Sequence, residues 1–248
     1  MSIEDALYSV GESVDSCGRW LRQFIFPRPS KEPPSFKHLR RLIKRDLTVH
    51  EFLSLTLQLA FIFYLVVNLI LLLLRLDVLW ILLTAPPYFL YIRYIIVRNR
   101  EFFLEPEPYR MFYYWIFGIS FASFAGYAMM RIVATTVYYY MGYLAVILGV
   151  ILMFRHYFRS RYGREWTYGT VEEVKGDAAR VFVHDDLAAN VKPGYYWVDA
   201  VPEAKPGRVV KLLIENRAIK GAVPVRILEV YLGGQSSQTE TEPNDAAD

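Results

Sequence analysis

Hydrophobic residues are concentrated in the middle of the chain, between Phe52 and Phe154, and charged residues lie on either side of this region. Four segments within it are apolar enough to cross a bilayer, and each is close to the ~20 residues that a spanning helix needs. These segments are residues 52–74, 76–97, 111–130 and 132–154. Arg75 to Asp77 connect the first two segments, and Arg131 alone connects the last two. The pattern therefore predicts two tight helical hairpins.

The pattern before the spans predicts two helices joined by a linker. In residues 1–26 apolar positions recur every three or four residues, which is typical of an amphipathic helix that packs on protein or lies in the membrane interface. Four prolines make residues 27–34 a stiff linker. Residues 35–51 predict a basic juxtamembrane helix. Thr48 and Glu51 have the spacing of a capping box, so the first spanning helix is expected to begin there.

After the fourth span the hydrophobic period changes from that of a helix to that of β-strands. Residues 165–232 contain five strand candidates separated by turn residues, which predicts a small β-barrel of SH3-like or OB-like type. The candidates are residues 166–175, 179–184, 195–201, 208–215 and 225–232. Residues 233–248 are polar and acidic and are expected to be disordered. The predicted fold is an α-helical integral membrane protein with four spans in two hairpins, followed by a C-terminal small all-β barrel.

Composition and charge add an orientation to this picture. A chain of 248 residues that is 54% hydrophobic is not an ordinary soluble enzyme. Its net charge of +3 conceals an asymmetry: the flanks on one side of the spans hold thirteen lysines and arginines, and the two opposite turns hold two. The positive-inside rule then predicts a multi-pass protein of the cytoplasmic membrane with both termini in the cytoplasm.

The basic juxtamembrane segment is a candidate for contact with membrane lipids. Cations immediately before a span attract anionic headgroups, although the same cluster would also serve to orient the chain. The candidate residues are Lys37, Arg40, Arg41, Lys44 and Arg45.

Small residues recur in the third and fourth spans with a spacing that allows helices to approach closely. Gly118, Ala122 and Gly126 form one such stripe, and Gly142, Ala145 and Gly149 form the other. Packing within the hairpin is the favoured interpretation, and a pore or a contact with a second copy of the chain is the alternative.

Pro86 and Pro87 lie in the middle of the second span and predict a helix kink, because proline lacks the amide hydrogen that a helix requires. The kink is interpreted as structural, since the other hairpin has no matching break that would suggest a transporter site.

Motifs for enzyme chemistry are incomplete. His50 and Glu51 begin like the zinc motif HExxH, but Ser54 replaces the second histidine. Ser120 lies in a Gly-x-Ser sequence that lacks the second glycine of a nucleophile elbow. The spans hold no carboxylate at midplane, which argues against coupled proton transport. We therefore expect no enzyme activity, no catalytic or metal-binding residue and no cofactor.

The barrel region has nine lysines and arginines against ten acidic residues, so we expect no binding of nucleic acid. Its aromatic cluster, Tyr195, Tyr196 and Trp197, is the candidate binding surface. An unknown cytoplasmic protein or a second copy of the chain is the expected partner.

The chain resembles an archaeal family of uncharacterised multi-pass membrane proteins, which is defined only as a domain of unknown function. The likeness rests mainly on four segments: YGTVEEVKG at 168–176, ANVKPGYYWV at 189–198, PGRVVKLL at 206–213 and GAVP at 221–224. This resemblance implies an archaeal cell membrane but no activity and no site residues. A weaker likeness links Gly169 to Val174 with the entry to the β domain of small mechanosensitive channels.

Three functions remain open at this point. The favoured hypothesis is a non-enzymatic membrane anchor or scaffold that presents the barrel for protein binding or assembly. The second is an oligomeric, passive or mechanosensitive-like channel lined by the fourth span. The third is a lipid-modifying enzyme that uses acids and arginines at the inner interface.

Overall fold

The structure is a computed structural model in which the chain forms two compact units, Met1–Tyr162 and Gly163–Asp248. It describes residues 48–217 and 221–231 and, nearer the N-terminus, residues 12, 15–16, 18–19 and 21–34. The basic juxtamembrane segment over residues 35–47 and the acidic tail lie outside the described residues.

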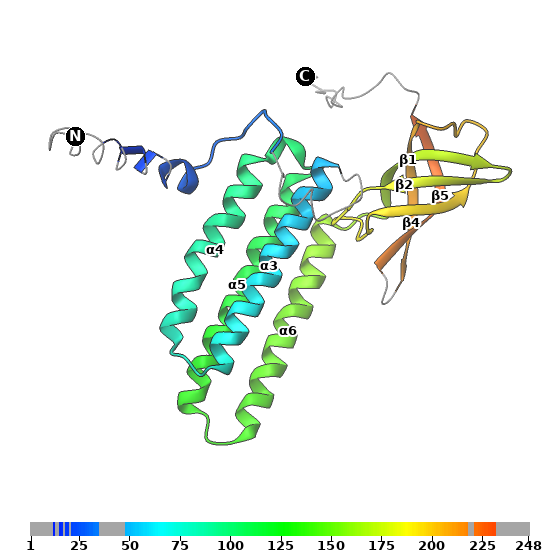
Figure 1. Cartoon of the computed structure of the whole chain (residues 1–248). Coiled ribbons are helices and arrows are strands. Elements are labelled where there is room, and N and C mark those ends of the chain that lie inside the picture. Colours follow the sequence, from blue (N-terminus) through cyan, green and yellow to red (C-terminus); the bar gives the residue numbers. More distant parts are fainter. Residues whose placement is uncertain are drawn as a thin grey trace, which may run out of the picture. The chain divides into compact units, whose positions relative to one another are not determined.

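The first unit contains the four predicted spans as long helices (Figure 1). They are α3 (Val49–Leu73), α4 (Val78–Arg98), α5 (Pro106–Val133) and α6 (Val137–Tyr162). A short 3-10 helix, η1 (Arg100–Phe102), follows α4. Each of the four helices is long and apolar enough to cross a membrane, which confirms the predicted set of spans.

The capping box predicted at the start of the first span is present. The Glu51 amide donates to Thr48 Oγ1 at 3.4 Å, and the Thr48 amide donates to Glu51 Oε2 at 3.0 Å. Because these two bonds satisfy amides that the first helical turn leaves open, α3 begins at Val49, directly after the predicted cap residue Thr48.

The predicted connection between the third and fourth spans is wrong in its position. The turn consists of residues 134–136, and Arg131 belongs to the last turn of α5. Its guanidinium donates to the Leu72 carbonyl at 3.4 Å and to the Arg75 carbonyl at 3.2 Å. A cation is favourable there because the last carbonyls of a helix lack partners and carry partial negative charge. Arg131 therefore caps the end of α3 instead of forming the turn.

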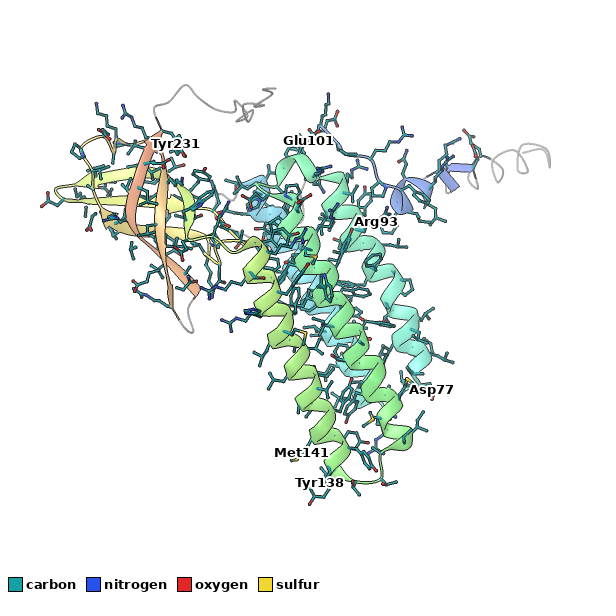
Figure 2. The ribbon with its side chains drawn as sticks, turned by 180° about the vertical axis from the view of Figure 1, so that it is seen from behind. Asp77, Arg93, Glu101, Tyr138, Met141 and Tyr231 are labelled. Carbon is teal, nitrogen blue, oxygen red and sulfur yellow. The ribbon has the colours of Figure 1, made fainter. Side chains whose placement is uncertain are left out.

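The two helical turns lie at one end of the bundle. Figure 2 places Asp77, Tyr138 and Met141 at this end and Arg93 and Glu101 at the opposite end. Asp77 occupies the N-cap position of α4, but its side chain makes no capping hydrogen bond.

The interior of the bundle is built from aromatic rings of three helices. Tyr64 of α3 and Tyr88 of α4 stack with ring centroids 4.3 Å apart, and both lie against Phe117 of α5. Beside them, the Thr84 hydroxyl of α4 donates to Asn68 Oδ1 of α3 at 3.1 Å. The ring contacts join the first hairpin to α5, and the hydrogen bond joins α3 to α4.

The described residues that precede the spans contact the end of α4. The Phe24 and Tyr94 rings are 5.1 Å apart, and Arg93 donates to the Ile25 carbonyl. After the helical turn ends at Ile25, residues 27–34 are non-helical, as expected for a proline-rich linker. The segment around Phe24 thus packs on protein at this point.

The second unit is a closed five-stranded barrel (Figure 1). Its strands are β1 (Trp166–Lys175), β2 (Ala178–Val183), β3 (Gly194–Asp199), β4 (Val209–Arg217) and β5 (Gly221–Tyr231). They follow one another around the barrel in the order β1-β2-β3-β5-β4, and only the β3–β5 contact is parallel. This Greek-key order is that of an OB-fold, and it distinguishes between the two barrel types that the sequence left open.

The fifth strand begins at Gly221, four residues before the predicted start at residue 225. Pro224 conceals this extension, because a proline interrupts the usual pattern of a strand. In the structure Pro224 pairs with Ile214 beside a shift in strand register, where the ladder does not need its missing amide hydrogen.

The core of the barrel comes entirely from its own strands and loops. It includes Val171, Val181, Val210 and Leu212, each at most 1% exposed. Gly169 lies against this core, and a Cβ there would approach the Phe182 carbonyl oxygen to 2.9 Å. The barrel therefore has the closed hydrophobic core of an independent domain.

Candidate functional site

The predicted aromatic cluster lies on β3, and strand alternation divides it. Tyr195 is 53% exposed and Trp197 is 52% exposed, so both point away from the barrel. Tyr196 packs against the core, and its hydroxyl donates to the Lys192 carbonyl at 2.8 Å. Burial raises the pKa of Tyr196. Two of the three predicted residues are therefore available for binding, and the third holds the strand in place.

Residues of β2 extend this outward surface. Phe182 pairs in register with Tyr195, and their ring centroids are 5.0 Å apart. The Arg180 guanidinium lies 5.2 Å from the centroid of the Tyr195 ring, and the His184 ring lies 5.1 Å from that of Phe182. Together Arg180, Phe182, His184, Tyr195 and Trp197 form what we call the β2–β3 aromatic surface.

Sequence reasoning did not assign the β2 members of this surface. The alternation of residues 180–184 is the feature of the sequence that could have indicated them, because it predicts that every second side chain of the strand faces outward. The pairing of β2 with β3, which brings these side chains beside Tyr195, was not known from the sequence.

Charges beside the β2–β3 aromatic surface are locally compensated. Glu173 of β1 accepts a hydrogen bond from Lys175 at 2.8 Å and lies 3.8 Å from Arg180. The bond from Lys175 lowers the pKa of Glu173, and the positive charges of Lys175 and Arg180 act in the same direction. The surface therefore offers aromatic faces and paired charges instead of a positively charged groove.

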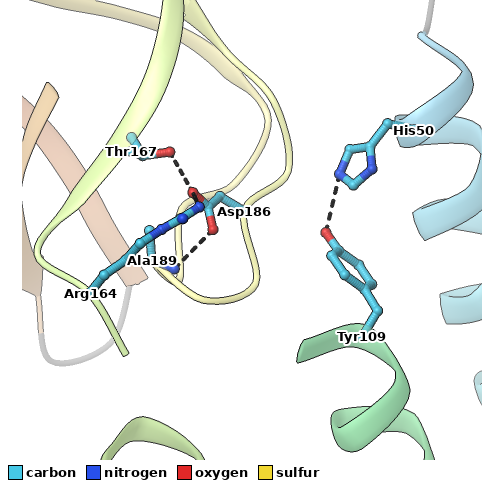
Figure 3. A network of polar contacts seen from close by, with 6 residues as sticks. All are labelled: His50, Tyr109, Arg164, Thr167, Asp186 and Ala189. Carbon is cyan, nitrogen blue, oxygen red and sulfur yellow. Dashed lines mark hydrogen bonds and ion pairs between the residues drawn. The ribbon is translucent and has the colours of Figure 1, made fainter. Parts of the chain in front are cut away.

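A buried carboxylate fixes the loop between β2 and β3 (Figure 3). Asp186 is 7% exposed and accepts three hydrogen bonds: from Arg164 at 2.7 Å, from the Thr167 hydroxyl at 2.6 Å and from the Ala189 amide at 3.0 Å. Because Arg164 and Thr167 belong to the segment that enters β1, this network ties the beginning of the barrel to the loop that leads into β3.

A second aromatic group lies on β1 and β5. The ring of Tyr168 is 5.0 Å from that of Trp166 and 5.9 Å from that of Tyr231. The Tyr231 hydroxyl donates to Glu229, which also accepts from Lys211, and both bonds lower the pKa of Glu229. The pKa of Tyr231 is raised, first by its interaction with Tyr168 and then by burial and Glu229. Here too, each charge has a close partner.

The incomplete zinc motif forms a buried polar contact in the first unit. The Tyr109 hydroxyl and His50 Nε2 are 3.3 Å apart (Figure 3). The His50 ring also contacts the Phe103 ring edge-on. Both His50 and Tyr109 are less than 10% exposed. Among the described residues, no group of three or more His, Cys, Asp or Glu side chains could hold a metal ion.

The small-residue packing predicted for the second hairpin is wrong at three of its six positions. A Cβ at Gly118, Gly142 or Gly149 would meet nothing within 4 Å. The reason is that aromatic residues fill the interface between α5 and α6. The Trp115 ring of α5 stacks on the Phe154 ring of α6, with ring centroids 5.9 Å apart. At these three positions the glycines therefore face away from the hairpin contact, which large rings form instead.

The remaining small residues divide between contact and exposure. A Cβ at Gly126 would lie 2.7 Å from the Tyr143 hydroxyl, so a larger residue at this position would have to displace the end of that side chain. The same hydroxyl lies 3.3 Å from the Ala122 carbonyl and donates to the Ser123 carbonyl at 2.6 Å. Ala145 is exposed. The hairpin is therefore closed by tyrosine and by other aromatic side chains.

Pro86 and Pro87 both lie inside α4, which continues without interruption from Val78 to Arg98. The Thr84 hydroxyl does not serve the carbonyls that these prolines leave open, because its one proton is shared between the Ile81 carbonyl at 3.0 Å and Asn68 Oδ1 at 3.1 Å. The predicted headgroup contacts lie outside the described residues; they are Lys37, Arg40, Arg41, Lys44 and Arg45.

Comparison with known proteins identifies a family but no characterised relative. Residues 21–228 match the model of a family described as predicted membrane protein (DUF2101). No curated protein and no solved structure matches the chain significantly. The match covers the four spanning helices and nearly the whole barrel, and the chain therefore belongs to the DUF2101 family of predicted membrane proteins.

Proposed function

We propose that this protein is a non-enzymatic membrane anchor whose barrel binds a protein partner through the β2–β3 aromatic surface. The observation that carries the proposal is the outward exposure of Tyr195 and Trp197 next to Arg180. Tryptophan, tyrosine and arginine are the residues that dominate the energy of protein interfaces. Large aromatic side chains on an outer strand face lose contact with water only when a partner covers them.

A protein partner fits this surface better than a nucleic acid does. OB-folds bind oligonucleotides on the face of strands 2 and 3, where aromatic stacking is combined with a positively charged groove. This surface has the aromatic side chains, but Glu173 lies within 4 Å of both Lys175 and Arg180 and offsets part of their positive charge. We therefore assign it to a protein segment with apolar or cationic side chains.

The proposed site of action is the cytoplasmic face of the cell membrane. The excess of lysine and arginine in one set of flanks supports this orientation. In that arrangement both helical turns, near Asp77 and Tyr138, face the outside of the cell (Figure 2). Reaction of single cysteines placed at these two positions with a membrane-impermeant reagent tests the orientation; labelling only after lysis would refute it.

Site-specific photocrosslinking in cells tests the binding surface. A photoreactive residue in place of Trp197 should give adducts of discrete mass, whereas the same residue at Glu215, which is exposed on β4, should not. Replacing both Tyr195 and Phe182 by alanine should abolish the adducts, provided that proteolysis shows the barrel to be intact. Adducts of equal yield from Trp197 and Glu215 would refute the proposal.

One observation favours a second candidate, an oligomeric passive or mechanosensitive-like channel lined by α6. No residue of α6 is buried within a single chain, and Gly142 and Gly149 face open space. A second copy could therefore approach this helix closely. Mass measurement in nanodiscs tests the idea, because a strictly monomeric protein has no such pore.

A further inference from the structure

A groove runs between α3 and α4 on the surface of the helical unit. It has a volume of about 670 Å³, which is within the range of small-molecule sites, and its lining is almost entirely apolar. Its lining includes Ala60, Phe63 and Tyr64 of α3 with Leu83, Pro87 and Tyr88 of α4. Phe63 is 70% exposed and Leu83 is 64% exposed, so the groove opens toward the surroundings of the bundle.

The groove lies at the depth of the hydrocarbon core. At 1.5 Å per residue, Tyr64 is about 22 Å from the Val49 end of α3 and about 14 Å from its Leu73 end. Pro87 is likewise about 14 Å from the Val78 end of α4. Water and lipid headgroups are therefore remote from the middle of the groove, and an occupant must come from the hydrocarbon phase.

On the α4 side of the groove, the backbone carbonyl of Leu83 lacks the amide that would donate to it in a regular helix. In a helix the amide of residue 87 would donate to the carbonyl of Leu83, but Pro87 has no amide hydrogen. Both Leu83 and Pro87 line the groove. The neighbouring hydroxyl of Thr84 is engaged with Ile81 and Asn68. An open carbonyl in a lipid environment is costly, so a ligand that donates a hydrogen bond would be stabilised there.

Two lining tyrosines add further unmet hydrogen-bonding capacity. Tyr64 is 3% exposed and Tyr88 is 9% exposed, and neither hydroxyl has a hydrogen-bond partner among the residues that the structure describes. Buried polar groups are nearly always paired, and an exception points to a missing partner. A phenol hydroxyl can donate as well as accept, which complements a ligand hydroxyl.

From these observations we infer that the α3–α4 groove binds a lipid alcohol, a long apolar molecule that carries one hydroxyl group. The hydroxyl donates to the Leu83 carbonyl and is able to accept from a tyrosine, while the chain fills the apolar remainder of the groove. A purely hydrocarbon chain would leave the acceptor open, and a lipid with only carbonyl or ether oxygens could not donate to it.

The test uses the full chain in nanodiscs and three probes of equal length: a hexadecanol with a photoreactive diazirine and an alkyne tag, its methyl ether, and the matching hydrocarbon. The alcohol should label α3 and α4 about fivefold more than the ether or the hydrocarbon, which is the effect expected of one net hydrogen bond. Excess untagged hexadecanol should compete. Equal labelling by all three probes would show that the groove accepts any acyl chain and would overturn the assignment.

Two variants separate the groove from the rest of the membrane surface. Ala60→Trp should fill the groove and abolish labelling by the alcohol, whereas Val66→Trp should leave it unchanged, since Val66 is exposed on α3 outside the groove. Pro87→Ala restores an amide hydrogen for the Leu83 carbonyl, so the preference for the alcohol over the ether should disappear while binding of the chain persists. Labelling that is insensitive to Ala60→Trp would place the site elsewhere.

Discussion

Removal of the Asp186 carboxylate should destabilise the barrel strongly. Asp186→Ala takes away three hydrogen bonds at once and leaves three donors inside the domain. The Thr167 hydroxyl belongs to a residue that is 1% exposed, and the Arg164 side chain is 15% exposed. Water therefore cannot replace the lost acceptor fully at either position.

The expected magnitude follows from this burial. Removing one partner of a buried ion pair costs about 3–5 kcal/mol, because the other charge remains buried without compensation. Asp186→Asn should cost less, about 2 kcal/mol, since an amide oxygen can still accept from the Ala189 amide. A domain of this size is stable by roughly 5–15 kcal/mol in total, so the alanine variant should remain folded but with a small margin.

The assay is pulse proteolysis of the full chain over a urea series, which reports the fraction of barrel that is unfolded without isolating the domain. Asp199→Ala is the matched control, because Asp199 is exposed at the end of β3. Thr167→Val should be costly in the natural chain and should cost less than about 0.5 kcal/mol in the Asp186→Ala background, where its partner is already gone. If Asp186→Ala shifts the urea midpoint no more than the control does, the network does not stabilise the barrel and the reasoning is refuted.

Three further predictions concern the helices and the barrel surface. Gly118→Leu should leave the thermal stability of the protein in detergent unchanged and Gly126→Leu should lower it, because only at Gly126 would a Cβ meet the Tyr143 hydroxyl; equal effects of the two changes would contradict the observed packing. Thr84→Val should weaken the pairing of the first hairpin by about 0.6 kcal/mol, the average for hydrogen bonds between membrane helices, measured by unfolding in mixed micelles. Unchanged stability would show that this bond contributes nothing. The lowered pKa of Glu173 means that its contribution to stability is complete above the ordinary value of 4.5 and is lost as the pH falls through the lower, folded-state value. In the Glu173→Gln variant the urea midpoint should therefore fall less steeply as the pH is lowered below 4.5. If the midpoint falls as steeply as in the natural chain, the loss of stability in acid comes from other groups.

Local sequence signals predicted most of the fold. Spanning helices depend on long apolar runs, and the Thr48 capping box depends on two side chains three residues apart, so both are visible in the sequence itself. The β1 strand was predicted at its observed bounds for the same reason. By contrast, the role of Arg131 depends on carbonyls 56 and 59 residues earlier in the chain, and no local pattern indicates such a contact.

The packing of the second hairpin shows where pattern reasoning failed. A small-xxx-small stripe allows helices to approach closely but does not require it, and both faces of α5 carry residues that could form an interface. Trp115 stacks on Phe154, and large rings can bury more area in a contact than glycines can, which makes the aromatic face the favourable one. Likewise, the aromatic cluster on β3 was evident in the sequence, but its division into exposed Tyr195 and Trp197 and core-facing Tyr196 required the strand register.

The glycine face of α6 bears on the choice between an anchor and a channel. Residues 144–154 of α6 contain no polar side chain, so a pore lined by this stretch would be a hydrophobic constriction that excludes water. Conduction would then require either a wide opening or polar groups from another helix. A close contact between two copies at Gly142 and Gly149 needs neither, because glycine allows two helix backbones to pack directly. An oligomer alone would therefore support assembly of the anchor, and only ion flux that depends on the residues facing Gly149 would favour the channel.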